Sequence, residues 1–342
     1  MDPGPGSQAE PGPSVIWRTM VLQRTLATAL AAAAVLIAAA PAEAKIQIGI
    51  SEQNNAMFAN KYFKPLKIRY GRVVVPWNIL KRRDYWPGYL QAWLDGAKAT
   101  GVEPHVVFNI QDIAPKYFGK GPTLAQYAAL IKGFRKKYPQ VRVFTPWDEE
   151  NHVFQPTAKS PKLAYEYYRI LRKGCPSCKI LAADVLDDSN LTSWLKRFKR
   201  YYRGSGTWGI HNYQDANKGR PFGQSWTYKM AKVVKGDIWS TEAGGLVGFK
   251  TVKGRVAYKY NLARQLKAQR YLFKLMGNPK VRNRYKRVYI YDFFGTWDAK
   301  GHRDNRWDSG LIARGANGKP RPAYYDLKKQ IAKSRRVRAS AR

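Results

Sequence analysis

Cysteine, histidine and acidic residues are all scarce in this 342-residue sequence, which contains two Cys, four His and 23 Asp and Glu. The two Cys have no His nearby to complete a tetrahedral zinc site, and the four His are scattered, so no metal is expected. No Gly-rich phosphate turn follows an early apolar strand, which argues against a nucleotide-binding open sheet. We therefore expect no cofactor.

Basic residues are abundant by contrast. The 61 Lys and Arg give a formal net charge of +38, enough to attract polyanions over long distances. No zinc finger or aromatic RNA-binding strand is present, so specific nucleic-acid recognition is not predicted. For an exported protein, anionic cell-wall polymers or acidic polysaccharides are the more available partners. A solvated basic surface that only aids solubility is the alternative.

The first 44 residues read as a signal peptide with an N-terminal extension. Arg18 and Arg24 flank an Ala-rich apolar run from Leu26 to Ala40, and Ala42-Glu43-Ala44 supplies small residues at a cleavage site. An uncleaved anchor is the competing interpretation, but the run is short and weakly apolar for a membrane span. No later segment approaches a transmembrane helix. We expect a secreted monomer, extracellular or bound to the cell wall.

Export to an oxidising compartment favours a structural disulfide between Cys175 and Cys178 in Gly174-Cys175-Pro176-Ser177-Cys178. A thioredoxin-type redox site shares this spacing. That site needs its first Cys at the start of a helix that follows a strand, whereas here the pair follows a predicted helix and precedes a predicted strand.

From residue 45 to 332, short runs rich in Val, Ile and Tyr alternate with segments of helical period, which is typical of βα units. The eight predicted strands are Ile46–Ile50, Lys67–Val75, Glu103–Asn109, Val141–Pro146, Ile180–Asp184, Thr207–Asn212, Asp237–Thr241 and Val288–Phe294. The predicted helices are Tyr89–Ala99, Leu124–Lys137, Pro161–Lys173, Leu191–Tyr202, Ala257–Leu275 and Pro322–Ile331. This count predicts the α/β class and a single (β/α)8 TIM barrel, with an open doubly wound sheet as the alternative.

Three further segments are assigned from composition. Gly248–Val256 and His302–Ser309 are expected to be long loops on the catalytic face, where the carboxyl ends of barrel strands meet. Residues 333–342 carry five basic and hardly any apolar residues, so they are expected to form a mobile basic tail.

Two apolar strands end in carboxylates. Glu149 follows the fourth strand in Trp147-Asp148-Glu149-Glu150-Asn151, and Glu242 follows the seventh. Hydrolysis of a glycoside with retention needs two carboxyl groups about 5 Å apart, one to protonate the leaving oxygen and one to attack the anomeric carbon. The ends of strands four and seven can converge across a barrel mouth. Arg72, on the second strand, is a candidate cation to keep the attacking carboxylate ionised, and Glu150 is the alternative proton donor.

The two segments resemble the signatures of the retaining clan A glycoside hydrolases, which are barrel enzymes. The resemblance implies that Glu149 is the acid/base and Glu242 the nucleophile, with Asp148 in place of the family's sugar-binding Asn. The stretch Gly209-Ile210-His211-Asn212-Tyr213 is similar to the clan's His-x-Tyr element, which implies that His211 lines the site and that Tyr213 hydrogen-bonds the nucleophile.

The sequence departs from the clan's pattern at two places. Ionised Asp148 can only accept a hydrogen bond and adds a charge beside the acid, whereas the family's Asn donates one. The resemblance places Phe293 at the position of the usual Trp after strand eight, with Trp297 a few residues beyond. Trp77, Trp147 and Trp297 are candidate sugar platforms, and packing in the core is the alternative for each.

Together these features predict a retaining glycoside hydrolase that acts on an extracellular or cell-wall oligo- or polysaccharide through a covalent glycosyl-enzyme. A catalytically inactive barrel that binds polysaccharide or another polyanion is the alternative. Binding of nucleic acid through charge alone is a third hypothesis, distinguished by steep salt dependence without sugar specificity.

Overall fold

The computed structural model describes Met1 and residues 46–251, 253–315 and 317–339. Residues Ala44–Arg342 form one compact unit, which is the unit described below. The predicted signal sequence and its cleavage site lie outside the described residues. Among the described helices, none combines the length and apolar character needed to cross a membrane.

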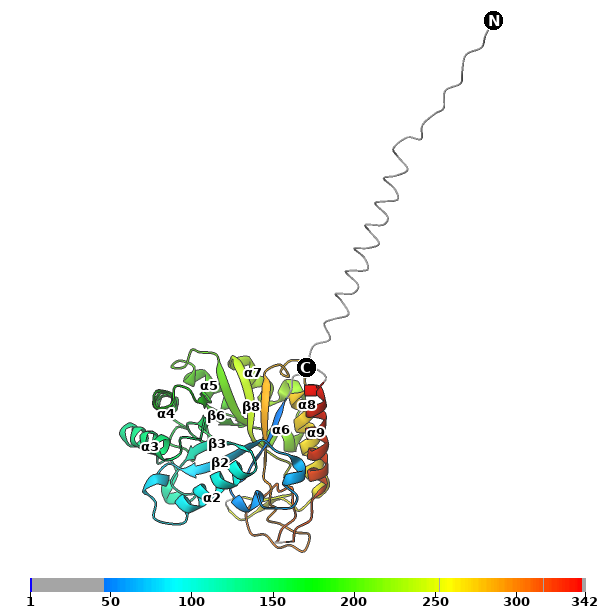
Figure 1. The fold of residues 1–342 in the computed structure, drawn as a ribbon, viewed down its shortest axis with the longest axis horizontal. Helices are drawn as coiled ribbons and strands as arrows, with labels where there is room; N and C mark the ends of the chain where they lie inside the picture. The colour runs from blue at the N-terminus through cyan, green and yellow to red at the C-terminus, as the bar shows by residue number, and fades with distance from the viewer. Residues whose placement is uncertain (2–45, 252, 316, 340–342) are drawn as a thin grey trace. The chain divides into compact units, whose positions relative to one another are not determined.

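A parallel nine-stranded sheet forms the centre of the fold (Figure 1), in the order β5-β4-β3-β2-β1-β11-β8-β7-β6. Its strands are β1 (Gln47–Ser51), β2 (Tyr70–Pro76), β3 (Glu103–Asn109), β4 (Val143–Thr145), β5 (Lys179–Ile180), β6 (Asp184–Leu186), β7 (Gly206–His211), β8 (Gly236–Ala243) and β11 (Tyr285–Tyr291).

The two ends of this sheet, β5 and β6, are halves of one short segment. Between them Leu181 N–H donates to Phe144 O at 3.0 Å, and Ala182 N–H donates to Thr207 O at 2.7 Å. The segment therefore hydrogen-bonds to the β4 side with its first half and to the β7 side with its second half, which closes the sheet into a barrel. Counted as one strand, it makes eight, and each predicted strand overlaps one of them. The predicted (β/α)8 barrel is confirmed.

Helices cover the outside of the barrel (Figure 1). They are α2 (Trp86–Ala99), α3 (Leu124–Lys137), α4 (Pro161–Gly174), α5 (Leu191–Phe198), α6 (Tyr213–Lys218), α7 (Trp226–Val233), α8 (Leu262–Met276) and α9 (Pro322–Ala339). Short 3-10 turns span Asn55–Met57, Lys64–Leu66, Ile79–Lys81, Pro115–Tyr117 and Phe222–Gln224. All six predicted helices are present. The prediction lacks the short helices α6 and α7, which have six and eight residues.

Local sequence explains the helix boundaries where the prediction is accurate. Thr123 and Gln126 form a reciprocal capping box at the start of α3. Tyr127, Leu130, Ile131 and Phe134 are buried, at the spacing of one helical face. This face packs on the barrel while Arg135, Lys136 and Lys137 occupy the last turn, where basic residues oppose the helix dipole.

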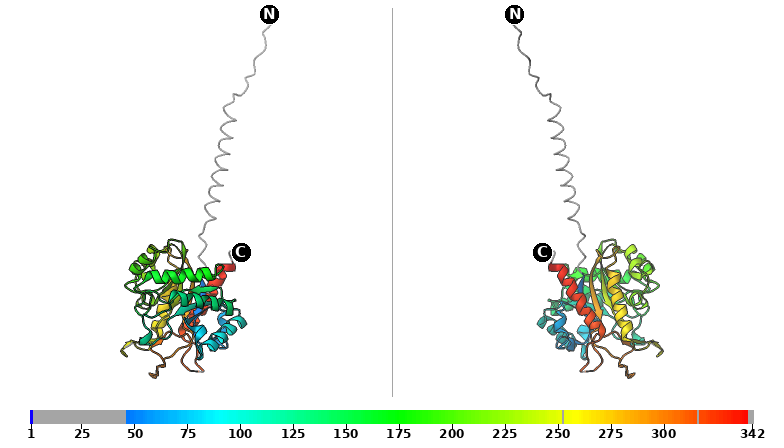
Figure 2. Two further views of the ribbon diagram at one scale, coloured as in Figure 1. Left: turned by 90° about the vertical axis from the view of Figure 1, so that its left-hand side faces the viewer. Right: turned by 90° about the vertical axis from the view of Figure 1, so that its right-hand side faces the viewer.

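Helix α9 continues beyond its predicted end and packs beside α8 (Figure 2). The Ser334 hydroxyl donates to the backbone oxygen of Ile46, and Arg335 donates to Lys67 O. Residues 333–339 belong to this helix. The expectation of a mobile tail is wrong for them, because these hydrogen bonds tie the helix to the start of the barrel. Residues 340–342 lie outside the described part of the chain.

The predicted loop segments on the catalytic face contain a second sheet. Strands β9 (Gly248–Lys250), β10 (Val256–Tyr258) and β12 (Trp307–Asp308) pair antiparallel in the order β10-β9-β12. The sheet joins the loop after β8 to the loop after β11. The two long loops are therefore present, but each is partly built of strand. The first loop also extends past its predicted end, because Val256–Tyr258 is strand and the helix predicted from Ala257 begins at Leu262.

A buried ion pair anchors this second sheet to the barrel. Arg321, just before α9, donates to Asp308 Oδ1 at 2.7 Å, and both side chains are almost fully buried. Asp308 also accepts from the backbone N–H groups of Thr296, Trp297 and Gly310. One carboxylate thus fixes the path of the loop that covers the catalytic face.

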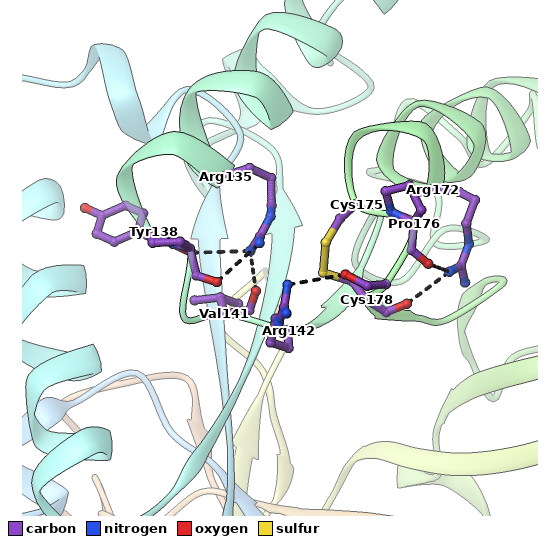
Figure 3. The surroundings of a disulfide bond; sticks show 10 residues. Arg135, Tyr138, Val141, Arg142, Arg172, Cys175, Pro176 and Cys178 are labelled. Atoms are coloured by element: carbon purple, nitrogen blue, oxygen red, sulfur yellow. Dashed lines mark hydrogen bonds between the residues drawn. A yellow bond between two sulfur atoms is a disulfide. The ribbon is translucent and has the colours of Figure 1, made fainter.

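Cys175 and Cys178 form a disulfide between the end of α4 and the start of β5 (Figure 3). Both residues are buried, and Arg172 donates to the backbone oxygens of Pro176 and Cys178 across the same turn. The sulfurs are therefore enclosed at a helix C-terminus, which is not the environment of a redox-active pair.

Replacing Arg321 by Met should lower the free energy of unfolding by about 3–5 kcal/mol, because it leaves the buried Asp308 carboxylate without its cation. Urea unfolding followed by circular dichroism measures the change. The matched control is Arg314→Met, since Arg314 pairs with Asp304 at an exposed position and its loss should leave the midpoint nearly unchanged. Equal effects of the two substitutions would contradict the anchoring role.

Candidate active site

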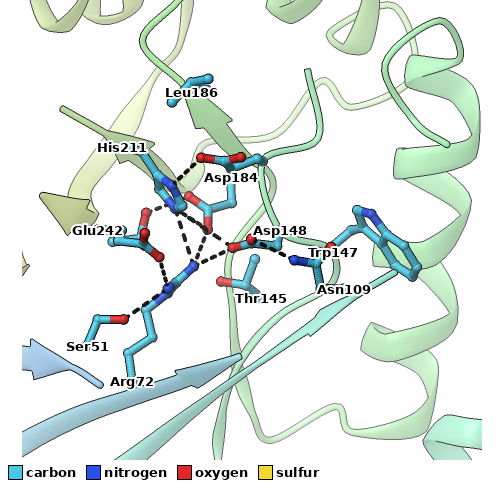
Figure 4. Close-up of polar contacts among 12 residues, drawn as sticks. Ser51, Arg72, Asn109, Thr145, Trp147, Asp148, Asp184, Leu186, His211 and Glu242 are labelled. Atoms are coloured by element: carbon cyan, nitrogen blue, oxygen red, sulfur yellow. Dashed lines mark hydrogen bonds and ion pairs between the residues drawn. The ribbon is translucent and has the colours of Figure 1, made fainter. Parts of the chain in front are cut away.

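The guanidinium of Arg72 lies at the centre of a charged cluster at the carboxyl ends of the strands (Figure 4). The side chain is fully buried on β2. Its Nη1 donates to Glu242 Oε2 at 2.5 Å and to Ser51 Oγ at 3.1 Å. Its Nη2 donates to Asp148 Oδ1 at 2.6 Å and Asp184 Oδ2 at 3.3 Å. One cation therefore joins three acidic side chains from different parts of the barrel.

Glu242, near the end of β8, is held by two donors. Arg72 contacts one carboxylate oxygen, and the Tyr213 hydroxyl donates to the other, Oε1, at 2.8 Å. Burial and the charge of Glu242 raise the pKa of Tyr213 well above its usual value, so the phenol keeps its proton and remains a donor. Both oxygens of the Glu242 carboxylate are therefore held by donors from the protein.

Glu149 follows β4 at a backbone position with φ of 43°, in the left-handed region that non-glycine residues seldom adopt. Its side chain is 23% exposed, and its Oε1 lies 3.1 Å from His211 Nδ1. Burial alone would raise the pKa of Glu149, but the hydrogen bond and charge of His211 outweigh burial and lower it. In the free protein Glu149 is therefore ionised at neutral pH.

His211, the last residue of β7, is fully buried between two carboxylates. Its Nδ1 contacts Glu149, and its Nε2 lies 3.3 Å from Asp184 Oδ2. Burial would lower the pKa of His211, but the charges of Asp184 and Glu242, together with hydrogen bonds to Asp184 and Glu149, raise it well above the usual value. The imidazole is thus protonated at neutral pH and donates from both nitrogens.

Asp148 and Asp184 complete the cluster with opposite pKa shifts. Burial raises the pKa of Asp148 to about 7 against the lowering effects of Arg72 and His211, while Glu242 and Glu149 raise it further. The Asn109 amide donates to Asp148 Oδ2 at 3.0 Å. For Asp184, burial is outweighed by His211 and Arg72, which lower its pKa to about 2. Asp184 is permanently ionised at neutral pH, whereas Asp148 is poised between its two forms.

Glu150 does not share this environment. It is fully buried, is absent from the cavity lining, and accepts a hydrogen bond from Asp184 N–H at 3.3 Å. Burial and the nearby charge of Asp184 raise its pKa well above the usual value. The alternative that Glu150 is the proton donor is therefore not supported, because no substrate can reach it.

A cation site is conceivable at one place in the described residues, since donor atoms of Asp148, Asp184 and His211 lie within 4.8 Å of one another. The Nη2 of Arg72 already contacts all three of these side chains. Its positive charge occupies the position that a metal ion would need and repels one. The arrangement fits an internal ion-pair network better than a metal site.

The cluster lies under a cavity of about 600 Å³, which is within the size range of small-ligand sites. Glu149, Glu242, Asp148 and Tyr213 all line it. Its aromatic lining comes from loops and strand ends: Phe118, Phe154, Phe249, Tyr258, Tyr291 and Trp307. The two predicted catalytic carboxylates thus share one hollow.

Four aromatic residues predicted to bind sugar lie elsewhere. Trp147 is fully buried, turned away from the charged cluster, and donates to Gln155 (Figure 4). Phe293 and Trp297 are buried under the loop after β11, and Trp77 lines a separate hollow. None of the four lines the main cavity. The packing alternative therefore applies to Trp147, Phe293 and Trp297, whereas Trp77 stays a candidate sugar platform outside the main cavity.

Tyr291 and Trp307 are aromatic residues that line the main cavity and that the sequence did not identify. Strand β11 ends at Tyr291, two residues before Phe293, so the strand-end aromatic at the cavity is Tyr291. The peptide bond after Tyr291 is cis. Trp307, from β12, has its ring centroid 4.5 Å from that of Tyr213. Asp184, at the end of the predicted fifth strand, is a further member of the site that no sequence motif identifies.

Comparison with known proteins supports the fold. No protein-family model and no curated protein matches the sequence. Solved glycosidase structures do match. A β-glycosidase has 12% identity and a TM-score of 0.57 over 85% of this chain and 97% of that one. The Ignisphaera aggregans GH53 catalytic domain has 12% identity and a TM-score of 0.60 over 86% and 98%.

A monomeric β-xylosidase from Caulobacter crescentus has 14% identity and a TM-score of 0.57 over 86% of this chain and 69% of that one. The chain has the barrel fold of these glycoside hydrolases. The resemblance to clan A is therefore confirmed at the level of the fold, while the low identities leave the chemistry to be argued from the residues of this chain.

The pKa of His211 gives a testable pH dependence. Because it is raised in the folded state, protonation of His211 contributes stability that is fully present below the unfolded value of about 6.5 and is lost as pH rises through the folded value. The loss of stability caused by His211→Asn should therefore be larger at pH 6 than at pH 9, as measured by urea unfolding. Nitrogen-15 spectra of the ring should show an imidazolium at pH 7, and a neutral tautomer there would contradict the assignment.

Proposed function

We propose that this protein is a glycosidase that cleaves glycosidic bonds with retention. The observation that carries the proposal is that Glu149 and Glu242, from the ends of β4 and β8, line the same cavity, with Glu242 held between Arg72 and Tyr213. Double displacement at an anomeric carbon requires two carboxyl groups in one site, one to attack the carbon and one to protonate the leaving oxygen.

In the first step, Glu242 attacks the anomeric carbon and the bond to the leaving oxygen breaks. Glu149 delivers the proton that the leaving oxygen takes. In the free protein this proton resides on His211, which contacts Glu149 directly. Substrate that excludes water from the cavity disfavours the ionised carboxylate, so the proton moves from Nδ1 to Oε1. The His211 and Glu149 pair thus acts as one acid.

In the second step, Glu149 accepts a proton from water, which attacks the glycosyl-enzyme and releases Glu242. His211 takes up the proton again and restores the ion pair. Tyr213 and Arg72 donate to Glu242 before and after its ester forms, so they stabilise the negative charge that returns to the departing carboxylate. The product keeps the anomeric configuration of the substrate.

We infer from the sequence of residues 1–44 that the protein is secreted as a monomer and acts outside the cell or at the cell wall. Its substrate is then an extracellular or cell-wall oligo- or polysaccharide, and anionic wall polymers are further partners of its basic surface.

A second candidate is a barrel that binds glycan without turnover. The lowered pKa of Glu149 favours it, because it reduces the supply of a proton from the acid position. Asp148 also favours it, because an ionised Asp cannot donate a hydrogen bond to the sugar. The two candidates share the cavity and differ only in bond cleavage.

Replacing Glu149 by Gln should lower kcat for natural glycans by about 10²–10⁴-fold, since general acid catalysis contributes a factor of that size. Aryl glycosides with an acidic leaving group should keep a faster first step, because that leaving group needs no proton. The control is Glu150→Gln, an adjacent buried carboxyl outside the cavity, which should retain activity. Glycan binding without measurable turnover in the unmodified protein would favour the second candidate.

The stereochemistry of cleavage is a separate test. Proton spectra recorded during the first minutes of hydrolysis should show the product anomer with the configuration of the substrate. Initial accumulation of the opposite anomer would show that water, and not Glu242, attacks the anomeric carbon.

A further inference from the structure

Basic and acidic residues are separated by depth in the main cavity. The acidic side chains that line it, Asp148, Glu149, Asp187 and Glu242, are buried or largely so, whereas Lys218 and Arg306 are exposed at its rim. Neither of these two basic side chains lies within ion-pair distance of a carboxylate in the described residues, and Lys218 contacts only the neutral amide of Gln214. The rim therefore presents positive charge above an acidic floor.

The two rim residues are fixed near Glu242 by the elements that carry them. Lys218 ends α6, which begins with Tyr213, the donor to Glu242. Arg306 directly precedes β12, and its backbone oxygen accepts from Lys250 N–H of β9 at 2.7 Å. The next residue, Trp307, places its ring against Tyr213. Both basic residues thus line the cavity from elements that meet at the contact between Tyr213 and Trp307.

A second hollow lies next to the main one across the loop that follows β3. Its volume is about 280 Å³, and it is lined by Trp77, Gln111, Lys116, Tyr117, Lys120 and Gly121. Tyr117 lines this hollow, while the next residue, Phe118, lines the main cavity. The Nζ of Lys116 lies 5.0 Å from the ring centroid of Tyr117, and no carboxylate lies within ion-pair distance of Lys116 or Lys120 in the described chain.

The two hollows therefore repeat one combination: aromatic surface for a sugar ring and two basic side chains without a carboxylate partner. Neutral sugars need the aromatic surface and hydroxyl partners, but they give no compensation for two neighbouring like charges. An anionic group on the sugar compensates these charges through charge-assisted hydrogen bonds to Lys and Arg. The buried acids are compatible with such a ligand because they face the scissile bond, below the rim.

We propose that the substrate is a glycan chain bearing anionic substituents. Lys218 and Arg306 pair with an anionic group next to the cleaved bond, and the hollow of Trp77, Lys116 and Lys120 binds a sugar unit further along the chain. The cleavage part of this inference rests on the proposed function, whereas the recognition of charge does not.

Binding is measured by calorimetry with the Glu242→Gln variant, so that turnover does not interfere. The probes are disaccharides and hexasaccharides of glucan, mannan and galactan backbones, each neutral, oxidised at C6 to the carboxylate, or sulfated at O6. At least one anionic hexasaccharide should bind about tenfold or more tightly than its neutral counterpart, with the carboxylate and sulfate arms identifying the preferred anion.

Two double variants separate the hollows. Lys218→Gln with Arg306→Gln should weaken binding of both the short and the long anionic probe by about tenfold, whereas Lys116→Gln with Lys120→Gln should weaken only the hexasaccharide. The charge-matched control is Lys162→Gln with Lys328→Gln on the outer helices α4 and α9, which should change affinity by less than about twofold because exposed charges far from the ligand are screened.

Equal binding of neutral and anionic probes, binding of no anionic probe, or an equal effect of the control variant overturns the proposal. Charge-dependent binding without hydrolysis by the unmodified protein would sustain the recognition site and reject the proposed cleavage. Hydrolysis of neutral glycans, with no tighter binding of anionic ones, would support the proposed cleavage and reject the recognition of charge.

Discussion

The buried guanidinium of Arg72 is the interaction on which the site depends. A charge without water is costly unless it is paired, and Arg72 is paired with Glu242, Asp148 and Asp184 at once. These acids come from β8, from the end of β4 and from β6, so the cation joins strands from opposite sides of the barrel. The same contacts that compensate its burial fix the position of the Glu242 carboxylate at the cavity.

His211 extends this network to the second carboxylate. It is protonated because Asp184 is permanently ionised beside it, and its Nδ1 lies 3.1 Å from Glu149 Oε1. Glu242 and Glu149 therefore differ in their partners: one is held by a cation and a phenol, the other by a group that can give up its proton. This asymmetry is the physical basis for assigning the nucleophile to one and the acid to the other.

The sequence predicts the strands and helices of the barrel well and the aromatic residues that line the cavity poorly. Buried parallel strands are continuous apolar runs, so Glu103–Asn109 and the capped helix Leu124–Lys137 are predicted to the residue. Whether a ring faces a cavity or the core depends on packing from distant segments, which explains the errors at Trp147 and Phe293 and the omission of Trp307. Asp184 belongs to no motif, and its role follows only from the closure of the barrel that brings it to Arg72 and His211.

The central claim is that Glu242, held between Arg72 and Tyr213, forms the covalent bond to the sugar. The most direct measurement is mass spectrometry of the protein after reaction with a panel of mechanism-based fluorosugars, run beside the Glu242→Gln variant. The account predicts a mass increase of one fluorosugar unit on a peptide whose modified residue is Glu242, and no increase in the variant. A sugar adduct on any other residue, retained in the variant, would contradict it.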